Sequence, residues 1–252
     1  MIKQLGISLL SRFGYVVKRR RSGIQRRGGT LAEAINSADL MLLLHGKNIY
    51  EGYDFKEIPP DTQGWGSDSK AFGKLIEEIR PRLIIEVGTW KGGSAITMAN
   101  ALRESGGGIV LCVDTWLGAV EMWNDKSDPE RFLSLRCKQG FPQVYFTFLA
   151  NVCHAGLQDF IVPFPLHSSS AALWLMMHGV LADMIYVDDA SHEEEDVYQD
   201  LLDYYELVSP KGVLFGDDWS WTGVRSAVTR FAAERKVQIN HLDDKWVIRK
   251  NG

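Results

Sequence analysis

Apolar runs and helical patterns alternate along most of the chain. The apolar runs have the length of buried strands and lie at 83–87, 109–114, 160–164, 184–188 and 213–218. Segments with helical spacing of apolar residues lie between and after these runs, at 69–79, 94–102, 171–177, 193–207 and 222–236. Strands that alternate with helices in this way predict an α/β fold, a doubly wound parallel sheet with helices on both faces.

The end of the chain departs from this alternation. Two strand patterns, 237–241 and 245–249, are separated by Asp243 and Asp244 and by no helical segment. They predict an antiparallel hairpin in which we expect no catalytic residue. Pro163 has no N–H to donate to a neighbouring strand, so the run at 160–164 is expected at an edge of the sheet.

Length and composition indicate a soluble globular protein. Of the 252 residues 45% are hydrophobic, and no apolar run is long enough to span a membrane. The cysteines Cys112, Cys137 and Cys153 form no Cys-x-x-Cys pair, which argues against disulfides or zinc and favours the cytoplasm. We expect an extension with a basic helix and a loop at 1–60 and a main domain at 61–252.

The first 27 residues are strongly basic, with eight lysines and arginines and no acid, although the net charge of the whole chain is −4. Their apolar positions fall on one helical face: Leu5, Leu9, Leu10, Phe13 and Val17. Such a helix can lie on an anionic membrane surface, dock on another subunit of a homo-oligomer, or stay a solvated tail. Nucleic-acid binding is not expected, because the rest of the chain is acidic and no base-stacking motif is present.

A glycine-rich loop follows the first strand, in the stretch Glu86-Val87-Gly88-Thr89-Trp90-Lys91-Gly92-Gly93-Ser94. Glycine at 88 and 92 lets a ligand approach the backbone closely. The dinucleotide fingerprint Gly-x-Gly-x-x-Gly is absent, because Trp90 stands at its second glycine. The spacing resembles motif I of the class I S-adenosylmethionine (SAM) methyltransferases. The alternative is a tight turn that binds no ligand.

Two later positions extend this resemblance. Asp114 ends the second strand, where a carboxylate can accept hydrogen bonds from ribose hydroxyls in SAM and NAD enzymes alike. Ser168 precedes the helix at 171–177, where it either contacts the adenine or only caps the helix. The resemblance implies that SAM binds to Glu86, Gly88, Thr89, Gly92, Ser94, Asp114, Thr115, Ser168 and Asp189.

Carboxylates end two further strands. The run at 184–188 continues into Asp189 and His192, and the run at 213–218 ends in Asp217 and Asp218. Neighbouring parallel strands bring their carboxyl ends to one edge of the sheet, so these acids are expected to converge there. Like charges in one site need a cation or raised pKa values, and hard oxygen ligands without cysteine favour Mg²⁺.

This acidic block, together with the glycine loop and the turn Val113-Asp114-Thr115-Trp116, resembles the metal-dependent sugar O-methyltransferases of macrolide biosynthesis. The macrocin and mycinamicin enzymes are examples, and the cephalosporin hydroxylase-like group is a relative. The resemblance covers about residues 60–220 and implies a Rossmann-like seven-stranded sheet whose last two strands are the hairpin. It also implies Mg²⁺ or a similar divalent cation on Asp189, Asp217 and Asp218, with His192 and Asp189 as the catalytic residues. Two departures stand out: Asp217 replaces a frequent Glu, and Asp188 could replace Asp189 as the ligand.

The resulting hypothesis is a SAM-dependent and Mg²⁺-dependent O-methyltransferase acting on a hydroxyl of a sugar, glycoside or other small natural product. A hydroxyl is a weak nucleophile near pH 7, so a cation would activate it and His192 would take its proton. The long connection that ends near Gln158 is expected to hold helices and a lid over this acceptor. The alternatives are an NAD-type oxidoreductase, against which Trp90 argues, and a SAM-binding or interaction protein without turnover.

Overall fold

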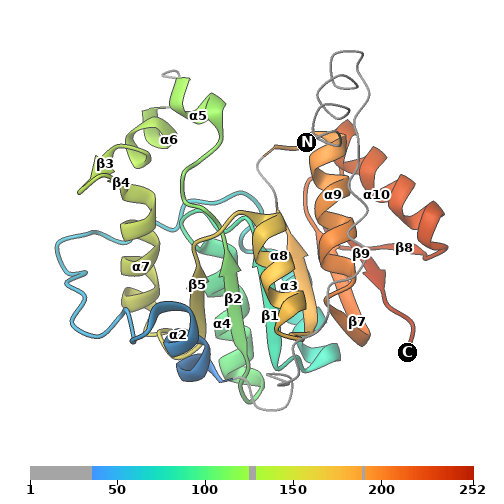
Figure 1. Ribbon diagram of the computed structural model, residues 1–252, viewed down its shortest axis with the longest axis horizontal. Coiled ribbons are helices and arrows are strands. Elements are labelled where there is room, and N and C mark those ends of the chain that lie inside the picture. The colour runs from blue at the N-terminus through green and yellow to red at the C-terminus, as the bar shows by residue number, and fades with distance from the viewer. Residues whose placement is uncertain (1–35, 125–128, 189–190) are drawn as a thin grey trace, which may run out of the picture.

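A seven-stranded sheet runs through the computed structural model, which describes residues 36–124, 129–188 and 191–252 (Figure 1). The strands are β1 Leu83–Val87, β2 Ile109–Val113, β5 Ile161–Phe164, β6 Ala182–Val187, β7 Val208–Gly216, β8 Ile239–Leu242 and β9 Lys245–Arg249. Their order is β5-β2-β1-β6-β7-β9-β8, and β9 pairs antiparallel with both β7 and β8 while the other pairs are parallel. The predicted parallel sheet that ends in a hairpin is confirmed.

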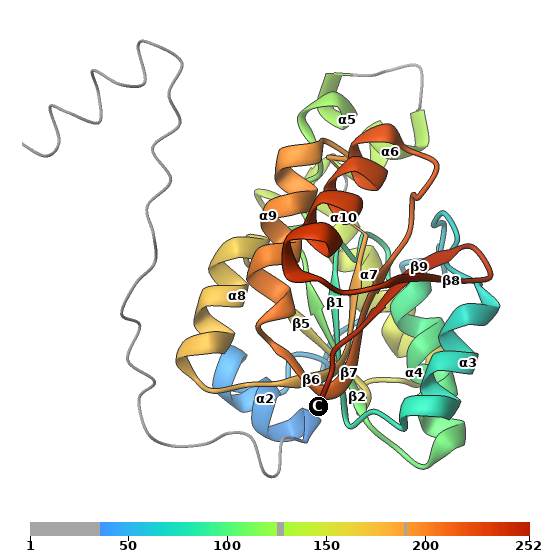
Figure 2. The ribbon, with the colours of Figure 1, turned by 90° about the vertical axis from the view of Figure 1, so that its right-hand side faces the viewer.

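Helices cover both faces of this sheet, as Figure 2 shows. The helices of the two layers are α3 Lys70–Ile79, α4 Gly93–Ser105, α8 Ser168–Met177, α9 Glu194–Tyr205 and α10 Thr222–Arg235. α3 and α4 pack together on one face, and α8 and α9 pack together on the other, where α10 also lies against α9. The chain is therefore a three-layer α/β structure.

The central strands carry the core. Every residue of β1 and β2 is buried. Because helices cover both faces, inward and outward positions alike face apolar neighbours, which is why these strands are unbroken apolar runs in the sequence. β5 lies at the edge of the sheet, where Pro163 predicted it.

Some element boundaries differ from the prediction. α8 begins at Ser168, three residues earlier than expected, with His167 as its N-cap and no side-chain cap hydrogen bond. The serines therefore form the first turn of the helix and do not cap it. β7 begins at Val208, five residues before the predicted run at 213–218, and so includes Pro210 to Gly212.

The connection between β2 and β5 contains helices, as the sequence predicted. It holds α5 Val120–Asn124, α6 Pro129–Ser134, the short hairpin of β3 Cys137–Lys138 and β4 Phe141–Pro142, and α7 Gln143–Ala155. α5 and α6 stand above the sheet at the top of Figure 1, beyond the carboxyl ends of the parallel strands. Their position allows this connection to cover whatever binds at that edge.

Residues 36–60 pack on the edge of the sheet. α2 (Ser37–His45), which the sequence did not predict, buries Leu40 and Met41 in the same core cluster as the strands. Tyr50 is buried beside them, and its hydroxyl donates a hydrogen bond to the carbonyl of Ile161 in β5 at 3.1 Å. The described part of the segment 1–60 thus shares its core with residues 61–252, and the boundary between the two stays a prediction.

No helix within the described ranges is both long and apolar enough to cross a membrane. The basic segment 1–27, for which we predicted membrane contact or subunit docking, lies outside the described residues. Those two interactions, and the homo-oligomer, therefore stay predictions.

Replacing Tyr50 tests whether residues 36–60 belong to the folding unit. We expect Tyr50→Ala to lower the free energy of unfolding by about 3 kcal/mol, because it empties a buried aromatic site. Tyr50→Phe, which loses only the hydrogen bond to Ile161, should cost about 1 kcal/mol. Urea unfolding followed by circular dichroism measures both. Leu42→Ala, on an exposed side chain of the same segment, is the control, and equal effects of all three variants would contradict a shared core.

Candidate functional site

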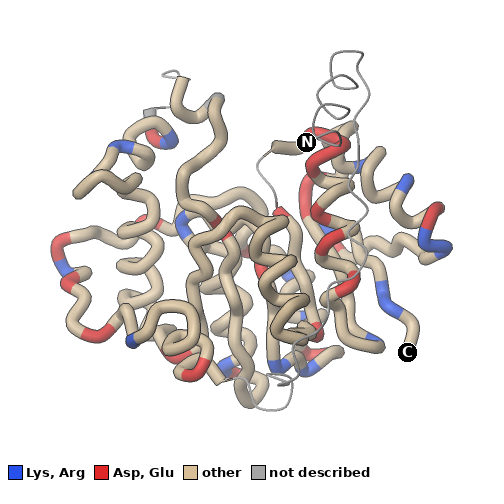
Figure 3. The backbone as a smooth tube through the Cα atoms, in the orientation of Figure 1, with Lys and Arg blue, Asp and Glu red and all other residues tan. Residues whose placement is uncertain are grey.

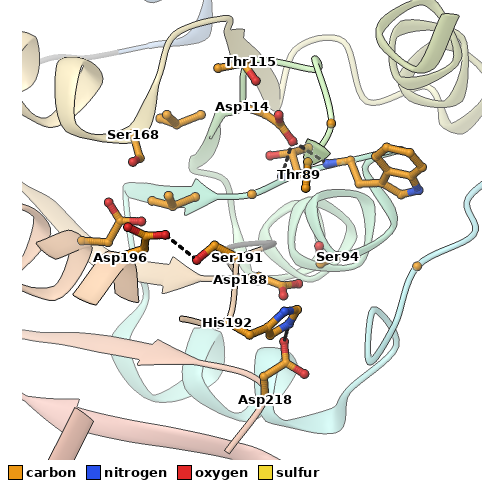
Figure 4. A pocket seen from close by; sticks show the side chains of 18 of the residues that line it. Thr89, Ser94, Asp114, Thr115, Ser168, Asp188, Ser191, His192, Asp196 and Asp218 are labelled. Atoms are coloured by element: carbon orange, nitrogen blue, oxygen red, sulfur yellow. Dashed lines mark hydrogen bonds and ion pairs between the residues drawn. The ribbon is translucent and has the colours of Figure 1, made fainter. Parts of the chain in front are cut away.

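A cavity of about 770 Å³ opens at the carboxyl edge of the sheet. Figure 4 shows its lining side chains, which come from the ends of β1, β2, β6 and β7 and from the first turns of α4, α8 and α9. Met122 of α5 and Arg131 of α6 also line it, so the connection above the sheet forms part of its wall. Ligands of open α/β sheets bind at this edge, which makes the cavity the candidate site.

The glycine loop forms the floor of the cavity and is held by Asp114. Gly88 turns the chain after β1 with φ of +83°, a conformation that side chains with a Cβ rarely adopt. One carboxylate oxygen of Asp114 accepts hydrogen bonds from the backbone N–H groups of Thr89 at 2.9 Å and Trp90 at 2.8 Å, and the other accepts from that of Trp116 at 2.7 Å. Asp114 therefore both lines the cavity and fixes the shape of its floor.

Glu86 lies directly below this floor and is fully buried. Its two oxygens accept hydrogen bonds from the hydroxyls of Thr89 at 2.8 Å and Ser94 at 2.5 Å. Burial raises the pKa of Glu86 to about 7, although the two hydroxyl hydrogen bonds act in the opposite direction, and the charge of Asp114 raises it further. Because Glu86 does not line the cavity, it acts on the floor through Thr89 and Ser94.

The structure brings most of the predicted SAM-binding residues together in the cavity lining and leaves two described ones, Glu86 and Gly92, out of it. Those that line the cavity are Gly88, Thr89, Ser94, Asp114, Thr115 and Ser168. Glu86 lies beneath them, and Gly92 is turned away from the cavity, since a Cβ on it would lie 2.8 Å from the ring of Phe148. Its neighbour Gly93 lines the cavity instead. Asp189 lies outside the described residues.

The loop before α3 closes over the glycine loop. Asp61 forms an ion pair with the buried Lys91 at 2.6 Å, and the side-chain oxygen of Gln63 accepts a hydrogen bond from the indole of Trp90 at 3.0 Å. The guanidinium of Arg131 lies 4.3 Å from the ring centroid of Trp65, so this loop and α6 meet. The end of this loop, at Gln63 to Trp65, lines the cavity.

His192 and Asp218 form a pair on the opposite wall. Nε2 of His192 lies 2.8 Å from a carboxylate oxygen of Asp218, as the dashed line in Figure 4 marks, and the His192 ring stacks on Trp221 at 4.4 Å. In a neutral imidazole this hydrogen bond places the proton on Nε2 and leaves the lone pair on Nδ1. Both residues have positive φ, +52° for His192 and +59° for Asp218, a strain that collects at functional sites.

Asp188 directly follows β6 and lines the cavity between the floor and this pair, as Figure 4 shows. Its carboxylate accepts a hydrogen bond from the hydroxyl of Tyr186 at 3.2 Å. Burial raises the pKa of Asp188 well above its ordinary value, and the nearby charges of Asp218, Asp217 and Glu86 raise it further. Of the two aspartates that the sequence offered for this position, Asp188 is the one that the described structure places in the cavity.

Of the three predicted magnesium ligands, Asp189 lies outside the described residues, and the carboxylates of Asp217 and Asp218 have different side-chain partners. Asp217 does not line the cavity, and one of its oxygens lies 2.5 Å from the ammonium of Lys245, which is fully buried. Its other oxygen accepts a hydrogen bond from the backbone N–H of Asp218. No group of three or more His, Cys, Asp or Glu residues that could hold a metal ion occurs among the described residues. Each oxygen of Asp217 therefore has a partner within the protein, and the Mg²⁺ site that the resemblance implied is not shown.

Sequence reasoning missed several residues of the site. Lys91 and Asp61 pair across the floor, Arg131 and Trp65 meet beside it, and Lys245 reaches Asp217 from the C-terminal hairpin. Only Lys245 had a signal in the sequence, because it begins a strand pattern whose next residues are apolar. The structure buries it in β9 together with Trp246 and Val247. No spacing rule could have paired it with Asp217.

A family model supports the assignment that the geometry suggests. Residues 85–219, more than half of the chain, match the model of a methyltransferase domain. The chain belongs to this methyltransferase family. The prediction of a class I SAM-dependent methyltransferase is confirmed. A search of curated protein sequences gives no match.

Solved methyltransferases share the fold at low sequence identity. The O-methyltransferase TomG from Streptomyces achromogenes, involved in tomaymycin synthesis and solved with SAM, is 18% identical, with 88% of this chain and 92% of TomG covered and a TM-score of 0.51. An O-methyltransferase from Bacillus cereus, solved with S-adenosylhomocysteine, is 17% identical over 100% of both chains with a TM-score of 0.52. CalS11, a TDP-rhamnose 3′-O-methyltransferase of calicheamicin biosynthesis, is 16% identical over 71% of this chain and 76% of CalS11 with a TM-score of 0.50.

The raised pKa of Glu86 predicts a pH dependence of stability. Between the ordinary carboxyl pKa and about 7, the unfolded chain ionises Glu86 while the folded protein keeps it protonated, so ionisation favours unfolding as the pH rises. We expect this residue to lower the free energy of unfolding by up to about 3 kcal/mol between pH 4.5 and pH 8. Glu86→Gln should remove that part of the slope.

Urea unfolding at a series of pH values compares the wild type with Glu86→Gln. Glu104→Gln, on an exposed position of α4, is the control and should follow the wild type. Parallel pH profiles for the wild type and Glu86→Gln would contradict a raised pKa.

Proposed function

We propose that the protein transfers the methyl group of SAM to a hydroxyl of a neutral or cationic small molecule, such as a sugar, glycoside or polyol. The observation that carries the proposal is the single cavity that joins the floor of Gly88 and Thr89 to the His192–Asp218 pair. A methyl donor on the floor and a proton acceptor on the opposite wall are the two elements that O-methylation needs.

SAM is proposed to lie along the glycine loop. Its ribose would bind Asp114, its adenine would lie by Thr115 and Ser168, and its amino-acid end would lie by Thr89, Gly93 and Ser94. Ser168 lies in the first turn of α8 and lines the cavity, which agrees with a role toward a ligand. The acidic walls favour a cofactor that carries a positive sulfonium.

The residues of the opposite wall are proposed to act on the acceptor. SAM supplies the methyl group: a C–O bond forms as the S–C bond breaks, and the electron pair stays on sulfur. Nδ1 of His192 takes the hydroxyl proton, while Asp218 holds the ring through Nε2 and stabilises the imidazolium that forms. The loop at 61–67 and α6 would exclude water from this transfer.

The charge of the cavity indicates the acceptor class. Asp196 and Asp200 of α9 line the wall beside Asp188, and acidic residues follow this helix in Figure 3. Arg131 is the one lysine or arginine in the lining formed by the described residues. Such a wall repels phosphate groups, whereas the exposed ring of Trp221 offers a flat face to a sugar ring. CalS11 acts on a nucleotide sugar, and we propose an acceptor without that diphosphate.

The family resemblance implied a Mg²⁺ requirement, which is untested, and the proposed reaction has no step at a metal. Natural-product biosynthesis, the cytoplasm and a homo-oligomer are likewise kept as proposals. For natural-product biosynthesis the support is the fold shared with TomG, an enzyme involved in tomaymycin synthesis.

Calorimetric titration tests the cofactor site. We expect Asp114→Ala to weaken SAM binding at least about tenfold, because the loop loses the acceptor of three backbone N–H groups and SAM loses a ribose partner. Asp159→Ala, an exposed residue before β5, should bind SAM like the wild type. NAD should not bind to any of the three proteins. Equal SAM affinity of Asp114→Ala and wild type would show that SAM does not lie on this floor.

Replacement of His192 tests the proposed base. His192→Ala should reduce turnover by about 10²–10⁴-fold, the usual contribution of general base catalysis, with SAM affinity unchanged. Asp218→Asn should reduce turnover by a comparable factor, because the amide can donate to Nε2 and so place the proton on Nδ1, the atom that has to accept it. The assay measures release of S-adenosylhomocysteine with a panel of neutral, amino and phosphorylated glycosides. His178→Ala, at the far end of α8, is the control, and full activity of His192→Ala would remove His192 from the mechanism.

A further inference from the structure

Lys245 is a cation buried at the edge of the candidate site. It begins β9, and because Gly216 pairs with Trp246, Lys245 lies opposite Asp217 across the antiparallel pair. Its side chain is fully buried, its ammonium lies 2.5 Å from a carboxylate oxygen of Asp217 and 2.7 Å from one of Asp244, and it also donates to the carbonyl of Gly66. The ammonium thus has three oxygen partners from three segments of the chain.

The surroundings are built around this ammonium. The rings of Phe72 and Tyr186 lie with their centroids 5.5 Å and 5.9 Å from it, and aromatic faces attract cations. A Cβ on Gly66 would lie 2.4 Å from a carboxylate oxygen of Asp217 and 2.8 Å from the ammonium, so a side chain there would displace the pair. The close approach of Gly66 and the aromatic walls thus enclose the ammonium together with its carboxylate partner.

We propose that Lys245 takes the place of a divalent cation at Asp217, so that methyl transfer in this protein needs no metal on the acidic pair. Asp217 is the carboxylate at which the family resemblance implied Mg²⁺, and the ammonium already holds the oxygen that such an ion would bind. A cation and an ammonium at one oxygen would repel each other at a few ångströms in a poorly solvated site. This inference rests on the proposed methyl transfer for its activity measurements only.

Lys245 also positions the proposed base. It holds one oxygen of Asp217 while the other accepts the N–H of Asp218, and the indole of Trp246 donates to the carbonyl of Asp217 at 2.9 Å. These contacts fix the turn in which Asp218 has its positive φ and reaches Nε2 of His192. Lys245 is thus a positioning residue, because it acts on the acceptor through Asp218 and His192.

Mn²⁺ titrations followed by electron paramagnetic resonance, with activity measured in EDTA and in Mg²⁺, test the inference. The wild type should keep its turnover in EDTA within about twofold. Lys245→Met should lose turnover at least about tenfold in EDTA, recover part of it in Mg²⁺ or Mn²⁺, and gain a Mn²⁺ site, because Asp217 is then left without its cation. The double variant Lys245→Met with Asp217→Asn should gain no such site and show no recovery. A purely structural role of Lys245 would give no recovery by metal in the single variant.

Controls and contrary outcomes follow from the same measurements. Lys74 of α3 forms an exposed ion pair with Asp243, which lies in the turn of the same hairpin. Lys74→Met is the control and should create no Mn²⁺ site. The inference is wrong if wild-type turnover is lost in EDTA and restored by Mg²⁺, or if the wild type binds Mn²⁺ at a site that Asp217→Asn abolishes. These wild-type and Asp217→Asn measurements decide the question even if Lys245→Met does not fold. If no form of the protein transfers a methyl group, the proposed function fails, and the Mn²⁺ titrations still decide the role of Lys245.

Discussion

Carboxylates crowd the carboxyl edge of the sheet, and the site depends on how their mutual repulsion is relieved. Asp114 accepts hydrogen bonds from three backbone N–H groups, and Glu86 accepts them from two hydroxyls and has a raised pKa. Asp217 is paired with the ammonium of Lys245, and Asp218 with the imidazole of His192. Several of these partners come from other segments than the acid itself, as Lys245 of β9 does for Asp217, so relieving the repulsion also ties those segments together. The contacts that compensate the charges at this edge are therefore the same contacts that shape the cavity.

The same contacts hold a strained backbone. Trp90, Trp116, His192 and Asp218 all have positive φ although none is glycine, and all lie just after strands β1, β2, β6 and β7. Such conformations persist only where the surroundings over-determine them. Asp114 supplies that constraint for Trp90 and Trp116, as Asp217 does for Asp218. Strain and charge compensation thus coincide at the tips of the strands, where a ligand would bind.

The fold could be predicted wherever burial is complete or strictly one-sided. β1 and β2 are buried on both faces and so appear as unbroken apolar runs, and the hairpin of β8 and β9 is marked by its paired aspartates. α2 escaped prediction because its apolar residues do not follow one face: Leu40 and Met41 are buried while Leu42 and Leu43 are exposed. Its existence depends on docking to β5, a contact that local sequence does not contain.

The sequence by itself determined the strands, the glycine floor and the expectation that acids converge at one edge, because buried strands and the residues at their ends follow from local patterns of burial. It placed Gly88, Asp114 and His192 in one site for the same reason. Only the tertiary structure decided what each acid touches, since that depends on β9 returning beside β7 and setting Lys245 against Asp217. Lys245 and Asp217 lie 28 positions apart in the chain, and no helical or strand periodicity links residues at that separation. The ammonium partner of Asp217 could therefore not be identified before the pairing of β9 with β7 was known.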